Sequence, residues 1–165
     1  MESHKKFKTK TGFCHILNDK IILTSDGNLE DISKINSSEN TIKRNLILYG
    51  ISGFLLIFLA YTGVKEKDWF KIIIISGFGI YLIYGAIKSI NYSNISLIER
   101  EKIKNVKFYP AKKFLIRAYF KVDFEDDKNN IKSRLIMLPG SLSNGLNETN
   151  KAYDIMCEQG LIAKV

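Results

Sequence analysis

The middle of the chain reads NLILYGISGFLLIFLAYTGV from Asn45 to Val64 and WFKIIIISGFGIYLIYGAIKSI from Trp69 to Ile90, with a short polar connection between them. Each run is long enough to cross a hydrocarbon core about 30 Å thick as a helix. No charge interrupts Leu46 to Tyr61 or Ile72 to Ile87, whereas a soluble helix of this length needs a polar face. The sequence therefore predicts a transmembrane helical hairpin over 45–64 and 69–90, and the lipid bilayer is its first partner.

Basic residues near the spans predict which side of the membrane the termini occupy. Positively charged residues gather on the cytoplasmic side, and they are counted close to the span ends. The connection 65–68 is short and its two lysines are offset by two acids. We expect a multi-pass protein of the inner membrane with both termini cytoplasmic. The first span is expected to act as the insertion signal, because no cleavable secretory signal follows the basic start. The flanking basic residues are Lys34, Lys43 and Arg44 before the first span, and Lys88, Arg100, Lys102, Lys104 and Lys107 at or after the end of the second.

The hairpin divides the polar sequence into an N-terminal arm, 1–44, and a C-terminal part, 91–165. The arm can bury little core, and a stretch of about 75 residues is near the lower limit for folding alone. A hairpin returns the chain to the side it left. We therefore expect the arm and the C-terminal part to form one split domain, with the membrane hairpin, 45–90, inserted in it.

The arm contains two short β-rich runs. Gly12 to Leu17 and Lys20 to Thr24 predict a β-hairpin that turns at Asn18-Asp19. Apolar residues then recur at helical spacing from Leu29 to Ile35, where a strand is the alternative. Residues 37–41 are interpreted as a linker to the membrane.

The C-terminal part predicts about four strands and a closing helix. Alternation of apolar and polar residues is clearest from Phe114 to Glu125. The helix is expected from about Asn147, as N-cap, to Gln159, with Gly160 at the C′ position. The predicted strands cover 95–99, 102–108, 114–125 and 131–138, and the core stripe of the helix is Ala152, Ile155 and Met156.

These elements predict an α+β membrane protein, in which a two-helix transmembrane hairpin is inserted into a small antiparallel β-sheet or partly open barrel with a C-terminal capping helix. Five segments carry a family resemblance: Thr11 to His15, Ile98 to Arg100, Ile103 to Phe108, Arg134 to Pro139 and Leu138 to Ser141. In these segments and in the order of its elements, the chain resembles bacterial pleckstrin-homology-like (PH-like) membrane proteins whose domain is split by two spans. It is also similar to small membrane proteins of the Bacteroidetes type. The resemblance covers nearly the whole chain and implies a fold rather than an activity.

No catalytic constellation appears in the sequence, and we expect no enzyme, cofactor or metal site. Asp123 and Glu125 lie two apart on one strand face without a further acid placed beside them, so a solvated hairpin face is the preferred interpretation. His15 is interpreted as a structural strand residue. Cys14 and Cys157 are expected to be free thiols, because the predicted side is reducing and the spacing of a metal site is absent.

Some similar proteins carry the name of a purine-biosynthesis ligase, phosphoribosylaminoimidazole-succinocarboxamide synthase. Such a ligase holds ATP, a metal and a phosphorylated substrate in a large soluble cleft. This chain has no Gly-rich loop that would cradle phosphates, and the loop 140–145 lacks the Gly-Lys-Ser/Thr ending. The residues therefore do not support that activity.

The formal charge of +8 indicates which partners the polar parts suit. No nucleic-acid-binding motif accompanies it, so we expect anionic lipids at the cytoplasmic leaflet and no nucleic acid. The predicted function is a non-enzymatic, membrane-anchored binding or scaffold module. The alternative is a protein-docking or assembly subunit of an envelope complex. For any single lysine, ordinary snorkelling or a solvated strand face is the preferred explanation. The candidate headgroup-binding residues, near a turn at 109–111, are Lys104, Lys107, Lys112, Lys113 and Arg117.

Small residues predict how the two spans pack on each other. Gly53 and Ala60 are seven apart, as are Gly79 and Ala86. Small side chains let helix backbones approach closely in a membrane, where hydrophobic burial offers little drive. We expect these residues at the helix interface, with the alternative that they are merely common membrane glycines and alanines.

Overall fold

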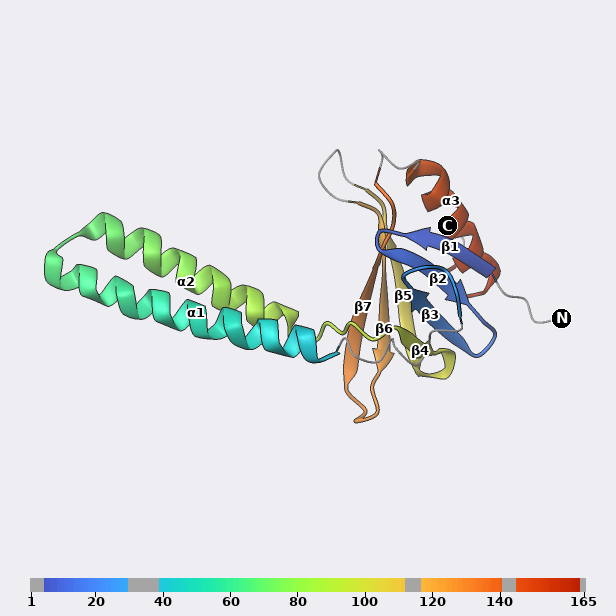
Figure 1. The fold of residues 1–165 in the computed structure, drawn as a ribbon, viewed down its shortest axis with the longest axis horizontal. Helices are drawn as coiled ribbons and strands as arrows, with labels where there is room; N and C mark the ends of the chain where they lie inside the picture. The colour runs from blue at the N-terminus through green and yellow to red at the C-terminus, as the bar shows by residue number, and fades with distance from the viewer. Residues whose placement is uncertain (1–4, 30–38, 112–116, 141–144, 164–165) are drawn as a thin grey trace. The chain divides into compact units, whose positions relative to one another are not determined.

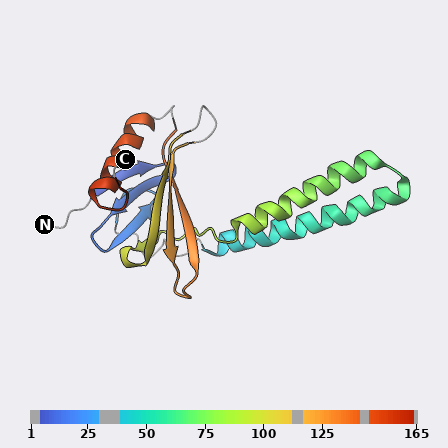
Figure 2. The ribbon, with the colours of Figure 1, turned by 180° about the vertical axis from the view of Figure 1, so that it is seen from behind.

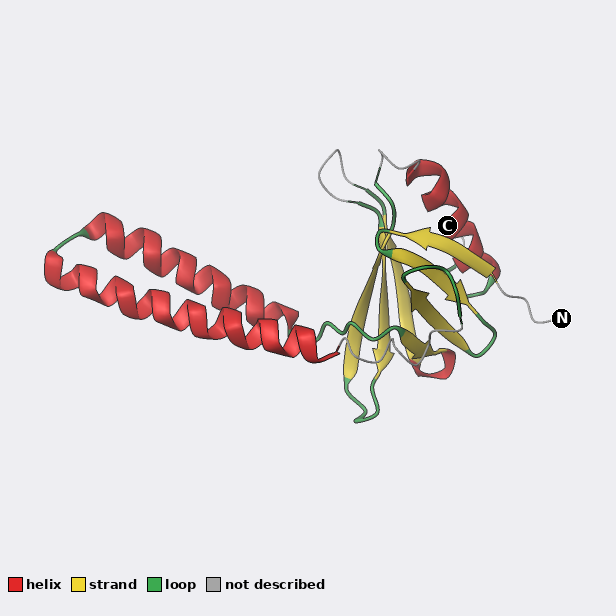
Figure 3. Cartoon of the chain, viewed as in Figure 1, coloured by secondary structure: helices red, strands yellow, loops and turns green. Residues whose placement is uncertain are grey.

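The computed structural model describes residues 5–29, 39–111, 117–140 and 145–163, and the chain divides into two compact units. The helical unit comprises Glu39–Asn91. The β unit comprises Met1–Ser38 together with Tyr92–Val165, and is therefore built from both ends of the chain. Figures 1 and 2 show the ribbon from opposite sides, and Figure 3 shows that all strands belong to the β unit. The helix or strand expected over 29–35 lies outside the described residues except for Leu29.

The helical unit is a pair of helices lying side by side, α1 (Glu39–Glu66) and α2 (Trp69–Ser89) (Figure 1). Both are long and apolar enough to cross a membrane, over Arg44–Lys65 and Trp69–Ser89, as the sequence predicts. The prediction of a linker over 37–41 is wrong from Glu39 onward, because α1 begins at Glu39. Polar residues there continue the helix without a breaking Pro or Gly.

Most large apolar side chains of the helical unit are exposed. Phe54 is 70% and Phe70 is 78% exposed, values that a soluble helix pair would not tolerate along its whole length. The turn between the helices uses Lys67 with a φ of 56°, and Oδ1 of Asp68 accepts a hydrogen bond from the Lys71 amide at 3.0 Å. Asp68 therefore caps α2 at the end of the short connection between the two helices.

The first sheet of the β unit has four antiparallel strands in the order β1-β2-β3-β4. The hairpin predicted over 12–17 and 20–24 is present as β2 and β3, and the amide of Leu17 donates to the Lys20 carbonyl at 2.9 Å. On its other side β3 pairs with β4, with Lys20 opposite Glu99, so the two halves of the split chain share one sheet. The strands are β1 (Lys5–Thr9), β2 (Gly12–Ile16), β3 (Lys20–Thr24) and β4 (Leu97–Glu99).

Strand β1 was not predicted, because its sequence is mostly lysine. Its one large apolar residue, Phe7, is 1% exposed and packs against Phe120 with ring centroids 6.0 Å apart. The chain returns into β2 through Gly12, whose φ is 149°. A Cβ at this position would lie 2.0 Å from the Thr24 carbonyl oxygen, so only glycine fits.

The remaining strands form a second antiparallel sheet in the order β5-β6-β7. Where the sequence predicts one small sheet or a partly open barrel, the described strands form two sheets, and a 3₁₀ turn, η2 (Arg100–Lys102), lies between β4 and β5. Of the strand predicted over 114–125, the part from Tyr119 to Glu125 is present, Arg117 and Ala118 are not in a strand, and 112–116 lie outside the described residues. The strands are β5 (Ile103–Tyr109), β6 (Tyr119–Glu125) and β7 (Ile131–Met137).

The core of the β unit combines side chains of both sheets and of the C-terminal helix α3 (Gly145–Glu158). Figure 1 shows α3 beside β1, and Tyr153 packs on Phe108 of β5 with ring centroids 5.2 Å apart. The predicted core stripe of α3 is confirmed, since Ala152, Ile155 and Met156 are all buried. The α+β class with antiparallel sheets is therefore the observed one.

The two ends of α3 differ in how well the sequence predicts them. The helix begins at Gly145, so the N-cap assignment of Asn147 is wrong. A Cβ at Gly145 would lie 2.4 Å from the Gly140 carbonyl oxygen, and this close approach lets the helix start earlier. The C-terminal prediction is confirmed: Gly160 has a φ of 68°, and its amide donates to the Cys157 carbonyl at 2.9 Å.

Candidate functional site

The candidate headgroup-binding residues do not form one cluster. Lys104, at the start of β5, lies with its Nζ 2.5 Å from Oε2 of Glu125 and is therefore paired within the sheet. Lys107 is exposed, and among the described residues it makes no ion pair. The guanidinium of Arg117 lies against Gly140, because a Cβ built there would be 3.1 Å from its Cζ. Lys112 and Lys113 lie outside the described residues.

The outward face of the second sheet gathers lysine and tyrosine side chains near Lys107. Lys107 lies directly opposite Lys121 on β6, and Tyr109 lies opposite Tyr119. The two tyrosine rings stack with centroids 4.8 Å apart and planes 11° apart. Like charges directly opposite each other in a sheet are destabilising, so this face favours a nearby anion. We call Lys107, Tyr109, Tyr119 and Lys121 the Lys-Tyr face.

Two acids offset part of this charge. Asp123 Oδ1 lies 3.1 Å from Nζ of Lys121 and accepts a hydrogen bond from Ser133 at 2.6 Å. The hydrogen bond to Asp123 raises the pKa of Lys121. Glu125 pairs with Lys104. Asp123 and Glu125 thus have separate basic partners, but both are half-buried rather than on the solvated face that the sequence predicts. Lys107 is the lysine of this face that stays without an acid among the described residues.

Sequence reasoning missed Lys121, Tyr109 and Tyr119 as members of this face. The signal was available, because the alternation in β6 places Tyr119 and Lys121 on its polar side. What the sequence lacked was the register that brings Lys107 opposite Lys121.

The helical unit places the small residues at the contact between its helices. A Cβ added to Gly53 would lie 2.6 Å from Cγ1 of Ile83 and 2.9 Å from the Gly79 carbonyl oxygen. The reciprocal distance, from Gly79 to the Gly53 carbonyl oxygen, is also 2.9 Å. Ala60 is buried and Ala86 is half-buried.

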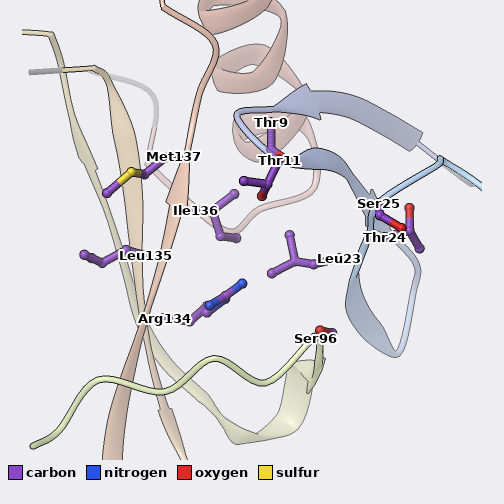
Figure 4. A pocket seen from close by; sticks show the side chains of 10 residues that line it. All are labelled: Thr9, Thr11, Leu23, Thr24, Ser25, Ser96, Arg134, Leu135, Ile136 and Met137. Carbon is purple, nitrogen blue, oxygen red and sulfur yellow. The ribbon is translucent and has the colours of Figure 1, made fainter. Parts of the chain in front are cut away.

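A pocket of about 170 Å³ lies within the β unit, between the ends of the first sheet and the inward side of β7 (Figure 4). In Figure 4, Arg134 and Ile136 point toward the side of Leu23, whereas Leu135 and Met137 point to the opposite side of β7. This is the alternation expected of a strand. The polar lining comes from Thr9, Thr11, Ser25, Ser96 and Arg134.

Arg134 is the charged residue of this pocket. Its Nη1 donates to the Ser93 carbonyl oxygen at 3.4 Å and to Oδ1 of Asn94, both neutral acceptors. Its Nε is buried without a hydrogen-bond partner. Burial lowers the pKa of Arg134, and no ion pair to a carboxylate of the described residues opposes this effect.

Cys14 and His15 lie on β2, and their side chains are part of the packed interior of the β unit. Both side chains are fully buried, and the two cysteines are free thiols, with Cys157 half-buried. Burial raises the pKa of the Cys14 thiol, so it stays neutral. Nε2 of His15 lies 2.9 Å from Oγ1 of Thr24, within hydrogen-bonding distance. These contacts fit the structural interpretation of His15.

Compared with profiles of protein families, with curated proteins and with solved structures, the chain matches none. The class of protein is therefore defined by the geometry alone. It is an α+β chain with a pair of helices able to cross a membrane and a unit of two antiparallel sheets.

Proposed function

We propose that this chain is a non-enzymatic, membrane-anchored binding module whose β unit contacts anionic lipid headgroups. The observation that carries the proposal is the Lys-Tyr face. It presents two lysines opposite each other and a stacked tyrosine pair on the outside of a sheet. Tyrosine is favoured at membrane interfaces because one end of its ring is apolar and the other polar, and lysine is attracted to acidic leaflets.

The helical unit supports this assignment by supplying the anchor. We place the protein in the inner membrane with both termini cytoplasmic, because basic residues flank the outer ends of both helices. Only Ile90 and Asn91 separate α2 from Tyr92, and a trans chain of this length spans at most about 11 Å. A membrane crossing by α2 would therefore keep the start of the C-terminal part near the leaflet surface.

A PH-like arrangement of the β unit is part of the proposal. Seven described strands in two antiparallel sheets, followed by a C-terminal helix, are compatible with it. The likeness to small membrane proteins of the Bacteroidetes type also stays a prediction.

Liposome binding tests the proposal when the anchor is removed. A chain joining 1–38 to 92–165 through a short flexible linker should bind vesicles that contain phosphatidylglycerol more strongly than phosphatidylcholine vesicles, and less strongly as salt rises. Lys107→Gln should weaken binding roughly fivefold, since each well-placed lysine contributes about 1 kcal/mol. Lys104→Gln is the matched control on the same strand, and its effect should be smaller because Lys104 is paired with Glu125.

Replacing Lys112 and Lys113 by Glu in the same chain tests the predicted basic turn, and should weaken binding roughly tenfold or more. If the joined chain folds but binds neither vesicle type, the lipid-binding proposal is wrong.

Protein docking is the second candidate function, favoured by exposed apolar residues on the outward face of the second sheet. Ile131 is 52% and Met137 is 41% exposed, which a partner protein could cover. A partner that copurifies in stoichiometric amount in mild detergent, and is lost on Met137→Lys, would favour docking over lipid binding.

A further inference from the structure

We propose that the pocket around Arg134 binds a phosphate group, either free phosphate or the monoester headgroup of a lipid. This site is separate from the Lys-Tyr face. Arg134 is on the inward side of β7, where its cross-strand partner is the buried Val122, whereas Lys107 and Lys121 point outward.

The first argument is uncompensated charge. Arg134 is half-buried. An arginine is always ionised in proteins, and withdrawing its charge from water is costly unless an opposite charge pairs with it. The recorded partners of Arg134 are the Ser93 carbonyl and the Asn94 amide oxygen, which are neutral. Cys14 does not supply the missing charge, because burial keeps its thiol protonated. Within the described part of the chain, the pocket therefore holds a cation without its counter-ion.

The second argument is the kind of donors that face the pocket. Arg134 lines the pocket, its Nε is buried without a hydrogen-bond partner, and four hydroxyl-bearing residues, Thr9, Thr11, Ser25 and Ser96, line the same space. A planar guanidinium fork with several hydroxyls suits a tetrahedral oxyanion, which offers many acceptors and a negative charge. Thr24 is engaged elsewhere, since its hydroxyl contacts His15 and accepts from the Gly27 amide at 3.2 Å.

The third argument is size. Pockets for drug-sized ligands and cofactors measure roughly 300–1,000 Å³. The volume here is about 170 Å³, which is enough for a phosphate group with some water but not for a nucleotide. The pocket therefore selects a small anion or the end of a headgroup.

Calorimetric titration of the full chain in a non-ionic detergent and a chloride buffer tests this inference. Inorganic phosphate should give saturable binding that chloride at equal ionic strength does not. Arg134→Gln should weaken phosphate binding roughly tenfold or more, because a charge-assisted hydrogen bond and the counter-charge are both lost. Lys151→Gln is the matched control: it removes one positive charge from an exposed position of α3, outside both the pocket and the Lys-Tyr face, and should leave phosphate affinity within twofold.

A second variant keeps the test valid if Arg134→Gln fails to fold. Thr11→Val preserves the shape of an exposed residue at the pocket and removes one hydroxyl, and it should weaken phosphate binding several-fold. Dihexanoyl phosphatidic acid and dihexanoyl phosphatidylcholine distinguish the source of the phosphate. Tighter binding of the phosphatidic acid than of inorganic phosphate assigns the site to a lipid, and the reverse order assigns it to free phosphate.

Three results would overturn the inference. They are the absence of saturable phosphate binding beyond that of chloride, equal weakening by Lys151→Gln and Arg134→Gln, and unchanged affinity in both Arg134→Gln and Thr11→Val. Each would mean that the pocket is not a specific phosphate site. None of them bears on vesicle binding by the Lys-Tyr face, so the two proposals fail separately.

Discussion

At the scale of single residues, Asp123 on β6 pairs with Lys121 of the Lys-Tyr face and accepts a hydrogen bond from Ser133 on the neighbouring strand β7. Burial raises the pKa of Asp123, but hydrogen bonds from Ser133 and Lys121 outweigh it and hold the pKa below its usual value. A carboxyl with a lowered pKa in the folded state contributes stability that is present above its unfolded pKa, near 4, and is lost as pH falls through the folded pKa.

We therefore expect Asp123→Asn to destabilise the protein at pH 7 by about 1 kcal/mol and to reduce the further loss of stability between pH 5 and pH 2. Thermal unfolding in detergent at several pH values measures both effects. Asp154→Asn, on an exposed position of α3, is the control. An acid sensitivity identical in Asp123→Asn and the parent chain would contradict the account.

Single residues also show where sequence reasoning stops. Arg134 looked like an ordinary polar member of an alternating strand, because nothing local indicates that its side of β7 is covered by the first sheet. Its burial depends on packing between segments more than a hundred residues apart, such as β3 and β7. The strand β6, by contrast, could be predicted from the sequence, because the alternation of apolar and polar residues is a local property.

At the scale of elements, close packing of α1 on α2 depends on Gly53 and Gly79. Gly53→Leu places a side chain where a Cβ alone would already lie 2.6 Å from Ile83 Cγ1. We expect the free energy of unfolding to fall by roughly 1–3 kcal/mol, as for other overpacked cores. The measurements are the unfolding midpoint in detergent, which should be lower, and cross-linking between the spans, which should be weaker. Gly79→Leu should act in the same direction.

Gly50→Leu is the matched control, because a Cβ at Gly50 meets nothing within 4 Å. Gly50 lies less than one turn from Gly53 on the same helix, and Gly50→Leu is the same chemical change as Gly53→Leu. Equal stability of the Gly53→Leu and Gly50→Leu chains would show that Gly53 is only a common membrane glycine.

Elements with a strong local pattern were predicted, and those that depend on distant partners were not. The two long apolar helices, the β2-β3 hairpin and the stripe of α3 follow from hydrophobic spacing and turn residues. Strand β1 was not predicted, since one buried Phe among lysines shows no alternation of apolar and polar residues. The division into two sheets was missed because η2 has no distinctive sequence.

At the scale of the whole molecule, the β unit needs both ends of the chain. β3 pairs with β4, the Arg100 amide donates to the Asp19 carbonyl at 2.8 Å, and Lys5 pairs with Glu158. Phe7, Cys14, Ile16 and Ile21 of the N-terminal strands belong to the shared core.

We expect a fragment of residues 91–165 alone to lack cooperative unfolding, because it loses three strands of the first sheet. Calorimetry of this fragment beside the joined chain, 1–38 with 92–165, makes the comparison. A fragment transition as stable as that of the joined chain would refute the split unit.

We propose that the helices cross a membrane and leave the β unit on the cytoplasmic side. Cysteine labelling in spheroplasts tests it most directly, after Cys14→Ala and Cys157→Ser remove the native thiols. Lys65→Cys, beside the connection between the helices, should react with a membrane-impermeant maleimide in intact spheroplasts. Leu146→Cys, exposed on α3, should react only after permeabilisation. Reaction of Leu146→Cys in intact spheroplasts, or protection of Lys65→Cys there, would contradict the account.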